Sequence, residues 1–277
     1  MFAAILEKVQ KQTPLVHCIT NYVTVNDVAN IVLASGGSPI MSDDIGEVEE
    51  ITTICNSLVI NIGTLNNRTI ESMIKAGKKA NQLGHPVILD PVGTGASALR
   101  TETTSQLLKE VKFAVIRGNL SEIKTISQGS GNTKGVDADQ ADQISDNTID
   151  SVISLAKKLS ADTGAIIAIT GAKDIVATAN KAYVIANGHP LMTKITGTGC
   201  MLSAVVGSYC GANYENQQQL LEAAVTAVTA VGLCGELAQQ KISTSAGGTS
   251  SLRTYLIDSM SQLTGERLEE GARIEVR

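Results

Sequence analysis

The chain has 277 residues, of which 43% are hydrophobic, and its 22 basic and 27 acidic residues give a formal charge of −5. This length is sufficient for one large α/β domain with an extensive core. Nucleic-acid binding is not expected, because the basic residues form no cluster, Trp is absent and aromatic residues make up only 3% of the chain.

The five cysteines, at positions 18, 55, 200, 210 and 234, are odd in number and widely spaced, with no Cys-x-x-Cys pair. Neither a disulfide framework nor a structural zinc site is therefore predicted. The N-terminal segment reaches charged residues too soon for a signal peptide. The most apolar stretch, Ala223–Gly235, is too short to span a membrane. We expect a soluble protein of the reducing cytoplasm that binds no membrane.

Apolar strands alternate with helices along most of the chain. The predicted strands are 15–19, 38–41, 57–62, 86–89, 113–116 and 165–169, followed by short strands at 174–177 and 181–185. The predicted helices are 1–12, 25–34, one that includes 48 and 51, 67–83, 103–110 and 147–160, then a long apolar helix after Cys200 and two or three more. Residues 129–135, poor in apolar groups, are expected to form a mobile loop. The charged tail after Thr264 is expected to be peripheral.

This alternation predicts a single α/β domain, residues 1–277, with a mostly parallel sheet, helices on both faces and antiparallel strands near 174–185 at one edge. In such folds ligands bind beyond the carboxyl ends of the strands. Polar residues and glycines follow several of the predicted strands: Asn61-Ile62-Gly63, Asp90-Pro91, Arg117-Gly118-Asn119 and Thr170-Gly171. Their convergence at one edge of the sheet predicts a site more strongly than any single segment does.

The turn Gly197-Thr198-Gly199-Cys200 runs directly into the long apolar helix. The first amides of a helix have no partner within it, and the helix dipole adds partial positive charge, so this turn is a predicted anion hole. The same field favours the thiolate of Cys200. An ordinary Thr N-cap with glycines in a tight turn explains these residues equally well.

Three charged residues near the strand ends have alternative explanations. Asp90 either caps the following turn or belongs to a site. Glu122, three residues after Asn119, is by itself better explained as part of a capping box. Arg117 ends an apolar strand and needs an anionic partner, either a carboxylate or a ligand phosphate.

An amide-lined anion site, carboxylates that bind Mg²⁺ and a neighbouring Arg together predict phosphoryl transfer. The chain has no G-x-x-x-x-G-K-[ST] segment, so a P-loop enzyme is excluded. His17, inside an apolar strand, and His189, next to Pro190, are expected to be structural rather than catalytic. The four other cysteines, Cys18, Cys55, Cys210 and Cys234, lie in apolar segments and are expected in the core.

Several of these segments resemble hydroxyethylthiazole kinase of the thiamine-salvage pathway, a family of the ribokinase-like superfamily. The similar segments are Asp90-Pro91-Val92-Gly93, Arg117-Gly118-Asn119-Leu120-Ser121-Glu122, Ile169-Thr170-Gly171 and Gly197-Thr198-Gly199-Cys200, with His17-Cys18-Ile19-Thr20-Asn21 and Pro39-Ile40-Met41 nearer the N-terminus. Gly-Thr-Gly-Cys is the most specific part, because most members of the superfamily have Asp at the position of Cys200.

The resemblance implies a ribokinase-like fold and ATP-dependent phosphorylation of the primary alcohol of 4-methyl-5-(2-hydroxyethyl)thiazole, with Mg²⁺. It also implies a homotrimer with active sites between subunits. The implied roles are Mg²⁺ binding for Asp90 and Glu122, ATP contact for Arg117, Thr170 and Asn21, thiazole contact for Met41, Gly197 and Val23, and catalysis by Cys200 beside the attacking hydroxyl. Whether Cys200 acts as a base or only positions the hydroxyl stays open.

Two other functions are alternatives to this interpretation. Another ribokinase-like enzyme, such as a hydroxymethylpyrimidine or pyridoxal kinase or an ATP-dependent hydrate dehydratase, would normally have Asp at position 200. A non-catalytic thiazole- or nucleotide-binding protein would not need Asp90, Glu122 and Arg117 intact. Both alternatives are therefore less favoured than the thiazole kinase.

Overall fold

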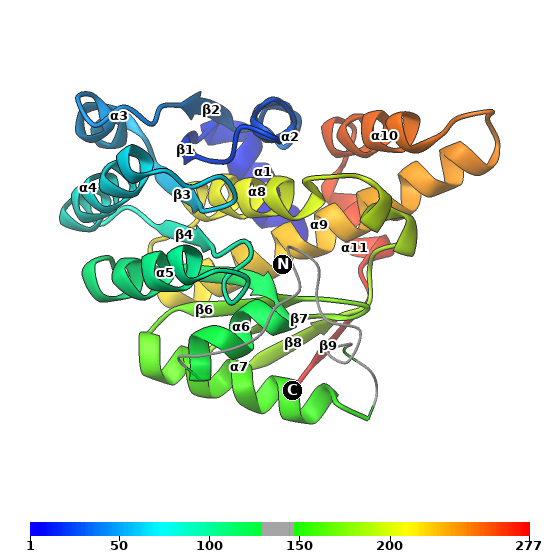
Figure 1. Cartoon of the computed structure of the whole chain (residues 1–277). Coiled ribbons are helices and arrows are strands. Elements are labelled where there is room, and N and C mark those ends of the chain that lie inside the picture. Colours follow the sequence, from blue (N-terminus) through cyan, green and yellow to red (C-terminus); the bar gives the residue numbers. More distant parts are fainter. Residues whose placement is uncertain (129–143, 145–146) are drawn as a thin grey trace.

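The computed structural model of the chain describes residues 1–128, 144 and 147–277, so the loop expected at 129–135 lies outside the described residues. Its centre is a nine-stranded sheet in the order β2-β1-β3-β4-β5-β6-β7-β8-β9, with helices on both faces (Figure 1). The strands are β1 (Leu15–Ile19), β2 (Ser38–Met41), β3 (Ser57–Asn61), β4 (Val87–Asp90), β5 (Val115–Asn119), β6 (Ile166–Thr170), β7 (Asp174–Ala177), β8 (Ala182–Ile185) and β9 (Ile274–Val276). The predicted α/β fold is confirmed.

The helices surround this sheet in the described part of the chain. They are α1 (Phe2–Gln12), α2 (Val25–Ala34), α3 (Val48–Ile54), α4 (Asn67–Leu83), α5 (Ala98–Glu110), α6 (Leu120–Gln128), α7 (Ile149–Thr163), α8 (Thr198–Ala212), α9 (Gln217–Ser243), α10 (Thr249–Ser261) and α11 (Gly265–Gly271), with a short 3₁₀ helix at Pro190–Lys194. Most of these lie within a few residues of the predicted positions; α5 begins five residues before the predicted 103.

Two apolar clusters, one on each face, hold the layers together. Strands β1 to β6 pair in parallel, and β7, β8 and β9 continue the sheet with antiparallel pairing. Side chains alternate along each strand: on β3, Val59 belongs to the cluster with α8 and α9, whereas Leu58 and Ile60 belong to the cluster with α4 and α5. Burial on both faces explains the continuous apolar runs of these strands.

Helix α8 lies close against the middle of the sheet because glycines face the strands. A Cβ added at Gly207 would lie 2.4 Å from Cγ2 of Val59, and one at Gly211 would lie 3.0 Å from Oγ of Ser57. Ser57 Oγ also donates a hydrogen bond to the Gly207 carbonyl at 2.8 Å. This close packing fixes the amino end of α8 relative to the ends of the strands.

At the C-terminal end, the apolar stretch 223–235 forms the expected core helix, but that helix is longer than the stretch, and the tail is not peripheral. The apolar stretch 223–235 is the middle of a longer helix, α9, whose most apolar window has a mean hydropathy of 1.6. That helix is long and apolar enough to cross a membrane, but 78% of the window is buried inside the protein, as in a core helix of a globular fold. The tail after Thr264 forms α11, with a fully buried Leu268, and then β9, which pairs with β8 at the edge of the sheet.

Candidate functional site

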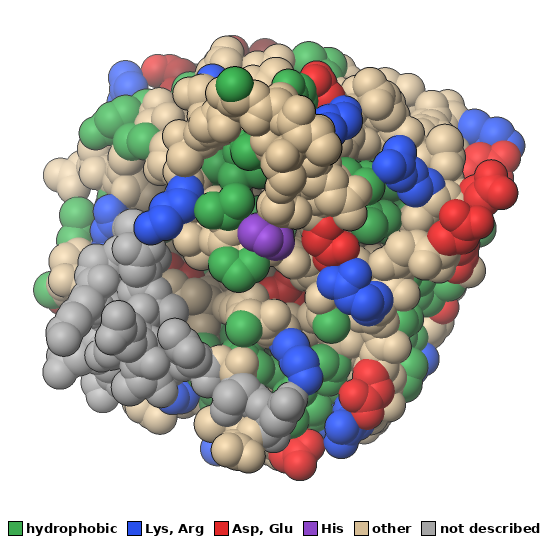
Figure 2. Space-filling view, turned by 90° about the vertical axis from the view of Figure 1, so that its right-hand side faces the viewer, with side chains coloured by type: hydrophobic (Ala, Val, Ile, Leu, Met, Phe, Trp, Pro, Cys, Tyr) green, Lys and Arg blue, Asp and Glu red, His purple; other side chains and the backbone are tan. Residues whose placement is uncertain are grey.

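The carboxyl ends of the central strands meet the amino end of α8 at one edge of the sheet. This edge lies on the right in Figure 1, and Figure 2, which views the molecule from that side, shows a hollow in the middle of the face. Residues Gly197 to Cys200, at the start of α8, are half-buried there, so solvent reaches the helix end. The predicted convergence of the strand ends is therefore present in the fold.

A chain of buried amide side chains links β1 to β4. Asn21 Nδ2 donates to Asn61 Oδ1 at 3.1 Å, and Asn61 Nδ2 donates to Asp90 Oδ2 at 2.8 Å. The amide and hydroxyl of Thr24 both donate to Asn21 Oδ1, which sets the orientation of that side chain. Because each amide both donates and accepts, the chain holds Asp90 in one position.

Asp90 is completely buried and only one of its oxygens is satisfied by hydrogen bonds. Oδ2 accepts from Asn61 and from the Ser203 hydroxyl, each at 2.8 Å. Oδ1 has no hydrogen-bond partner in the described part of the chain, and Arg117 Nη1 lies 3.5 Å from it. Burial raises the pKa of Asp90, while the Arg117 charge and the hydrogen bonds oppose that rise. Oδ1 is thus a carboxylate oxygen available to a cation or a ligand donor.

Arg117 lies between this carboxylate and the first turn of α8. Its Nη2 donates to Thr170 Oγ1 at 2.7 Å, and its Nε has no hydrogen-bond partner among the described residues. A Cβ added at Gly199 would lie only 2.6 Å from Nη1 of Arg117, so the guanidinium packs directly on the helix backbone at that glycine. The structure therefore brings together the strand-end Arg, the strand-end Thr and the Gly-rich turn.

Glu122 forms the capping box that its spacing suggests. Its Oε2 accepts from the Asn119 amide at 2.8 Å, and Asn119 Oδ1 accepts from the Glu122 amide at 2.9 Å. The other oxygen, Oε1, accepts from the Gly93 amide at 2.8 Å. Burial and the charge of Asp90 raise the pKa of Glu122 to about 7. Capping and participation in a site are therefore compatible for this residue.

Two carboxylates, Asp90 and Glu122, suit Mg²⁺ better than a metal ion that is coordinated entirely by protein side chains. Within the described part of the chain, no three His, Cys, Asp or Glu side chains gather in a way that would hold a metal ion. Mg²⁺ commonly uses one or two carboxylates and completes its coordination with water and substrate phosphates. The orphaned Oδ1 of buried Asp90 is the atom best placed for direct or water-mediated contact.

The amino end of α8 has no side-chain cap. Its N-cap is Gly197, with φ +85°, and the first helical bond runs from the Met201 amide to the Gly197 carbonyl. The Thr N-cap alternative is therefore wrong. A Cβ at Gly197 would lie 2.4 Å from Cγ2 of Thr24, so both the backbone angle and the packing require glycine there. The free amides before Met201 can donate to an anion.

Cys200 lies in this first turn, but its thiol is not activated. Its Sγ accepts a hydrogen bond from Asn21 Nδ2 at 3.1 Å. Burial and the charge of Asp90 raise the pKa of Cys200, although contacts with Thr24, Asn21 and Asn61 partly oppose the rise. The expectation that the helix field favours the thiolate is wrong, because desolvation and a neighbouring carboxylate outweigh it.

The residues implied to contact the thiazole lie at the edge of this region. Val23, in the turn before α2, is 60% exposed, and Met41, at the end of edge strand β2, is half-buried against the cluster that includes α8. Thr198 is half-buried, with its hydroxyl 3.5 Å from the Met192 carbonyl. The side chains of Val23 and Met41 are apolar, so neither can hydrogen-bond to the linked side chains of Asn21, Asn61 and Asp90.

The two histidines considered above are structural. His17 is buried between Thr52 Oγ1 at 3.0 Å and the Ser42 carbonyl at 2.8 Å. His189 Nδ1 accepts from the Leu191 amide at the start of the 3₁₀ helix. The four cysteines expected in the core, Cys18, Cys55, Cys210 and Cys234, are buried free thiols.

Sequence reasoning missed three polar residues around the site. Asn61 was noted only as a strand-end residue, and Ser203 was hidden in an apolar helix, although its position three residues after Cys200 puts both on one face of α8. Asp174, on β7, accepts from the Gly171 amide at 2.9 Å. Burial raises the pKa of Asp174 to about 7, and the Arg117 charge opposes that rise, so a third carboxyl group lies within the electrostatic reach of Arg117.

Comparisons with known proteins agree on one family. Residues 6–266 match the model of the hydroxyethylthiazole kinase family. A hydroxyethylthiazole kinase from Clostridium acetobutylicum is 61% identical over 98% of this chain and 97% of its own length. The structure of a hydroxyethylthiazole kinase from Pyrococcus horikoshii superposes with a TM-score of 0.87 at 30% identity, covering 100% of this chain and 98% of that one. A ribokinase-like superfamily protein from Enterococcus faecalis, at 11% identity and a TM-score of 0.63, covers 95% of each chain and shares the fold.

Proposed function

The chain belongs to the hydroxyethylthiazole kinase family, and we propose that the edge of the sheet between Asp90 and the α8 turn is where it transfers phosphate. The predicted activity, ATP-dependent phosphorylation of the thiazole alcohol, is confirmed by this relationship. The observation that carries the site assignment is the ion pair of buried Asp90 with half-buried Arg117, beneath an uncapped helix end. A carboxylate, a cation and free amides in one place are what phosphoryl transfer requires.

The nucleotide phosphates would lie between Arg117 and the α8 turn. The guanidinium and the amides of Gly197, Thr198, Gly199 and Cys200 would donate to phosphate oxygens, with Thr170 holding Arg117 in place. Asn21, whose Nδ2 lies 3.1 Å from Cys200 Sγ, would lie near the same oxygens. Asp90 and Glu122 would hold Mg²⁺, which neutralises phosphate charge when bound.

In the transfer step, the primary alcohol oxygen attacks the γ-phosphorus. The new O–P bond forms as the bond to the β-phosphate oxygen breaks, ADP leaves, and the hydroxyl proton passes to solvent. Cys200, whose thiol stays protonated, positions the alcohol rather than removing its proton. The loose transition state of phosphoryl transfer needs little help from a base, so donation by the helix amides is the larger contribution.

The thiazole would lie against Met41, Gly197 and Val23. Val23 and its neighbour Tyr22 are 60% and 76% exposed, so one chain alone leaves this side of the site open. A homotrimer with its sites between subunits would cover it. Light scattering at assay concentration, combined with activity, tests this: a fully active monomer contradicts the shared site. The free cysteines are compatible with a cytoplasmic location.

The experiment that tests this function is ADP release with a panel of alcohols. The thiazole alcohol should stimulate ATP turnover, and hydroxymethylpyrimidine and pyridoxal should not. Stimulation by either of those compounds but not by the thiazole would favour the other ribokinase-like activities. No turnover with any alcohol, despite thiazole binding, would favour a binding protein.

A metal arm of the same assay tests the carboxylates. Glu122→Gln should raise the Mg²⁺ concentration needed for half-maximal turnover. Glu102→Gln, an exposed position on α5, is the matched control and should behave as the unmodified enzyme. An unchanged Mg²⁺ requirement in Glu122→Gln would remove Glu122 from the proposed metal site.

A further inference from the structure

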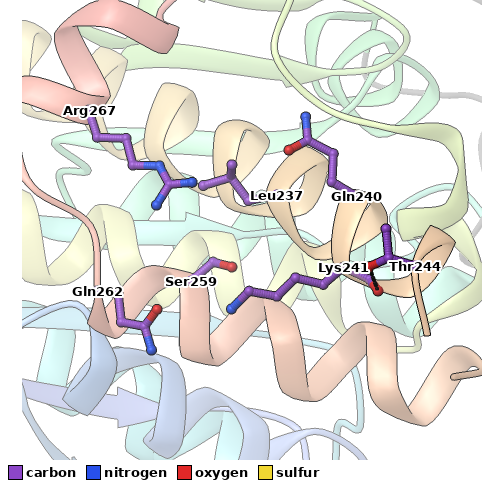
Figure 3. Close-up of a pocket in the computed structure, with 7 residues that line it drawn as sticks. All are labelled: Leu237, Gln240, Lys241, Thr244, Ser259, Gln262 and Arg267. Atoms are coloured by element: carbon purple, nitrogen blue, oxygen red, sulfur yellow. Dashed lines mark hydrogen bonds between the residues drawn. The ribbon is translucent and has the colours of Figure 1, made fainter.

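A second cavity, of about 260 Å³, lies between α9, α10 and α11 and shares no lining residue with the site around Asp90 (Figure 3). Lys241 on α9 and Arg267 on α11 line it together with the hydroxyls of Thr244 and Ser259 and the amide of Gln262. Figure 3 shows the Lys241 side chain extending toward Ser259, with Arg267 across from it. The cavity is thus lined by cations and hydrogen-bond donors, and no carboxylate belongs to its lining.

Neither cation is neutralised by an acid within the described part of the chain: no carboxylate oxygen lies within 4.0 Å of the Lys241 ammonium or the Arg267 guanidinium. Lys241 has a ring contact, with its Nζ 5.5 Å from the centre of Tyr255. Both charges act on the same buried thiol, because each of them opposes the burial that raises the pKa of Cys234 to about 12. Lys241 and Arg267 therefore line the same cavity, and neither forms an ion pair with a carboxylate of the described residues.

Ser259 supplies the second, independent observation. Its side chain is only 4% exposed, and its Oγ is buried without a hydrogen-bond partner among the residues that the structure describes. Two buried hydroxyls on the neighbouring helix α9, those of Thr226 and Thr229, instead donate to the carbonyl one turn before, at 2.6 and 2.8 Å. A buried hydroxyl without a partner costs about 1–3 kcal/mol, so its presence at the wall of a cationic cavity points to an acceptor that binds there.

We propose that this cavity is a binding site for a phosphate group, either free inorganic phosphate or the phosphate of a small monoester. An Arg, a Lys, the Ser259 hydroxyl and the Gln262 amide approach the cavity, and a tetrahedral oxyanion has enough acceptor positions for all of them, while the Thr244 hydroxyl already donates to the Lys241 carbonyl at 3.0 Å. A carboxylate has only two oxygens and would leave more of these donors unsatisfied. The proposal does not depend on the function of the site at α8.

Isothermal titration calorimetry with inorganic phosphate tests the site. Lys241→Gln and Arg267→Gln should each weaken phosphate binding roughly tenfold or more, the effect of losing one charge-assisted contact. Lys158→Gln and Arg68→Gln, at exposed positions on α7 and α4, are matched controls and should stay within about twofold of the unmodified protein. Phosphate binding that is equally tight in Lys241→Gln and Arg267→Gln, or absent from the unmodified protein, overturns the proposal.

Ser259→Ala distinguishes ligand binding from a role in the fold. Removing a hydroxyl that has no protein partner should leave the free energy of unfolding unchanged or higher, while phosphate affinity falls. Lower stability with unchanged phosphate affinity would show that the hydroxyl serves the fold, and would contradict the proposal. A parallel titration with ethyl phosphate identifies the source: tighter binding of the ester indicates a monoester, and tighter binding of inorganic phosphate indicates the free ion.

Discussion

Arg117 Nη1 lies 3.5 Å from Asp90 Oδ1, the one oxygen of that buried carboxylate without a hydrogen bond. The pair joins β5 to β4, and the same guanidinium packs on Gly199 at the start of α8. Arg117 therefore contacts both halves of the proposed site, the side of the carboxylates and the side of the helix amides.

Replacing Arg117 should impair the use of ATP more than the binding of the thiazole. Arg117→Gln removes a charge-assisted contact, which is worth about 1.5–3 kcal/mol, or roughly a ten- to 150-fold rise in KM for ATP. Steady-state kinetics with each substrate varied in turn measures this, with Arg68→Gln as the control. Unchanged KM and kcat for ATP in Arg117→Gln would reject the assignment.

Cys200 should be replaceable with modest loss. Because burial and the Asp90 charge raise its pKa, the thiol stays protonated and cannot accept the proton of the alcohol. Cys200→Ser should therefore lower kcat by about 10²-fold or less. Cys200→Asp puts a carboxylate where related kinases have one and should keep or raise kcat. A Cys200→Asp variant that folds and binds ATP but has no turnover would show that the sulfur itself is required.

Gly197 should be required for both its backbone angle and its packing. Gly197→Ala should lose more stability than Gly84→Ala, because both glycines have positive φ, +85° and +73°, but only at Gly197 does the new Cβ meet a neighbour, Thr24. Gly84→Ala should cost about 1–2 kcal/mol from the left-handed backbone alone. Chemical denaturation and kinase assays compare the two. Equal losses of stability with equal, full activity would contradict a special role for the turn.

Stability should fall in mild acid because of His17. Burial lowers the pKa of His17, so the folded state holds the ring neutral while the unfolded chain binds a proton below about pH 6.5. The contribution of the neutral ring is complete above that pH and is lost as the pH falls toward the lower, folded-state pKa. Denaturant unfolding between about pH 7.5 and 5 measures the slope. His17→Gln should have a shallower slope than the unmodified protein, and equal slopes in the two proteins would refute the role of His17.

The sheet could be predicted because its strands are apolar on both faces and end in polar residues. Val115–Asn119 shows the limit of this reasoning: the strand begins later than its apolar run suggests and continues through Arg117, because pairing with β6 overrides local composition. β9 was missed because three residues at the end of a charged tail become a strand only through pairing with β8.

The site was partly visible in the sequence for a similar reason. Asp90, Arg117 and the Gly-rich turn follow apolar elements and stand out, whereas Ser203 and Asn61 matter only through their bonds to Asp90. The pKa of Cys200 depends on burial by distant segments and on a carboxylate 110 residues away in the chain. Burial and the Asp90 charge act on Cys200 only in the folded protein. The local sequence could therefore indicate the helix field, which lowers the pKa of Cys200, but not the two effects that raise it.

The central claim, that the site built on Asp90 transfers phosphate to the thiazole alcohol, is tested most directly by ³¹P NMR of the reaction. With ATP, Mg²⁺ and the thiazole alcohol, a phosphate-monoester signal should appear together with ADP for the unmodified protein. Asp90→Asn, which keeps the shape of the side chain but removes its charge, should produce almost none while still folding. A monoester signal formed by Asp90→Asn at the unmodified rate, or ADP formed by the unmodified protein without any monoester, would contradict the account.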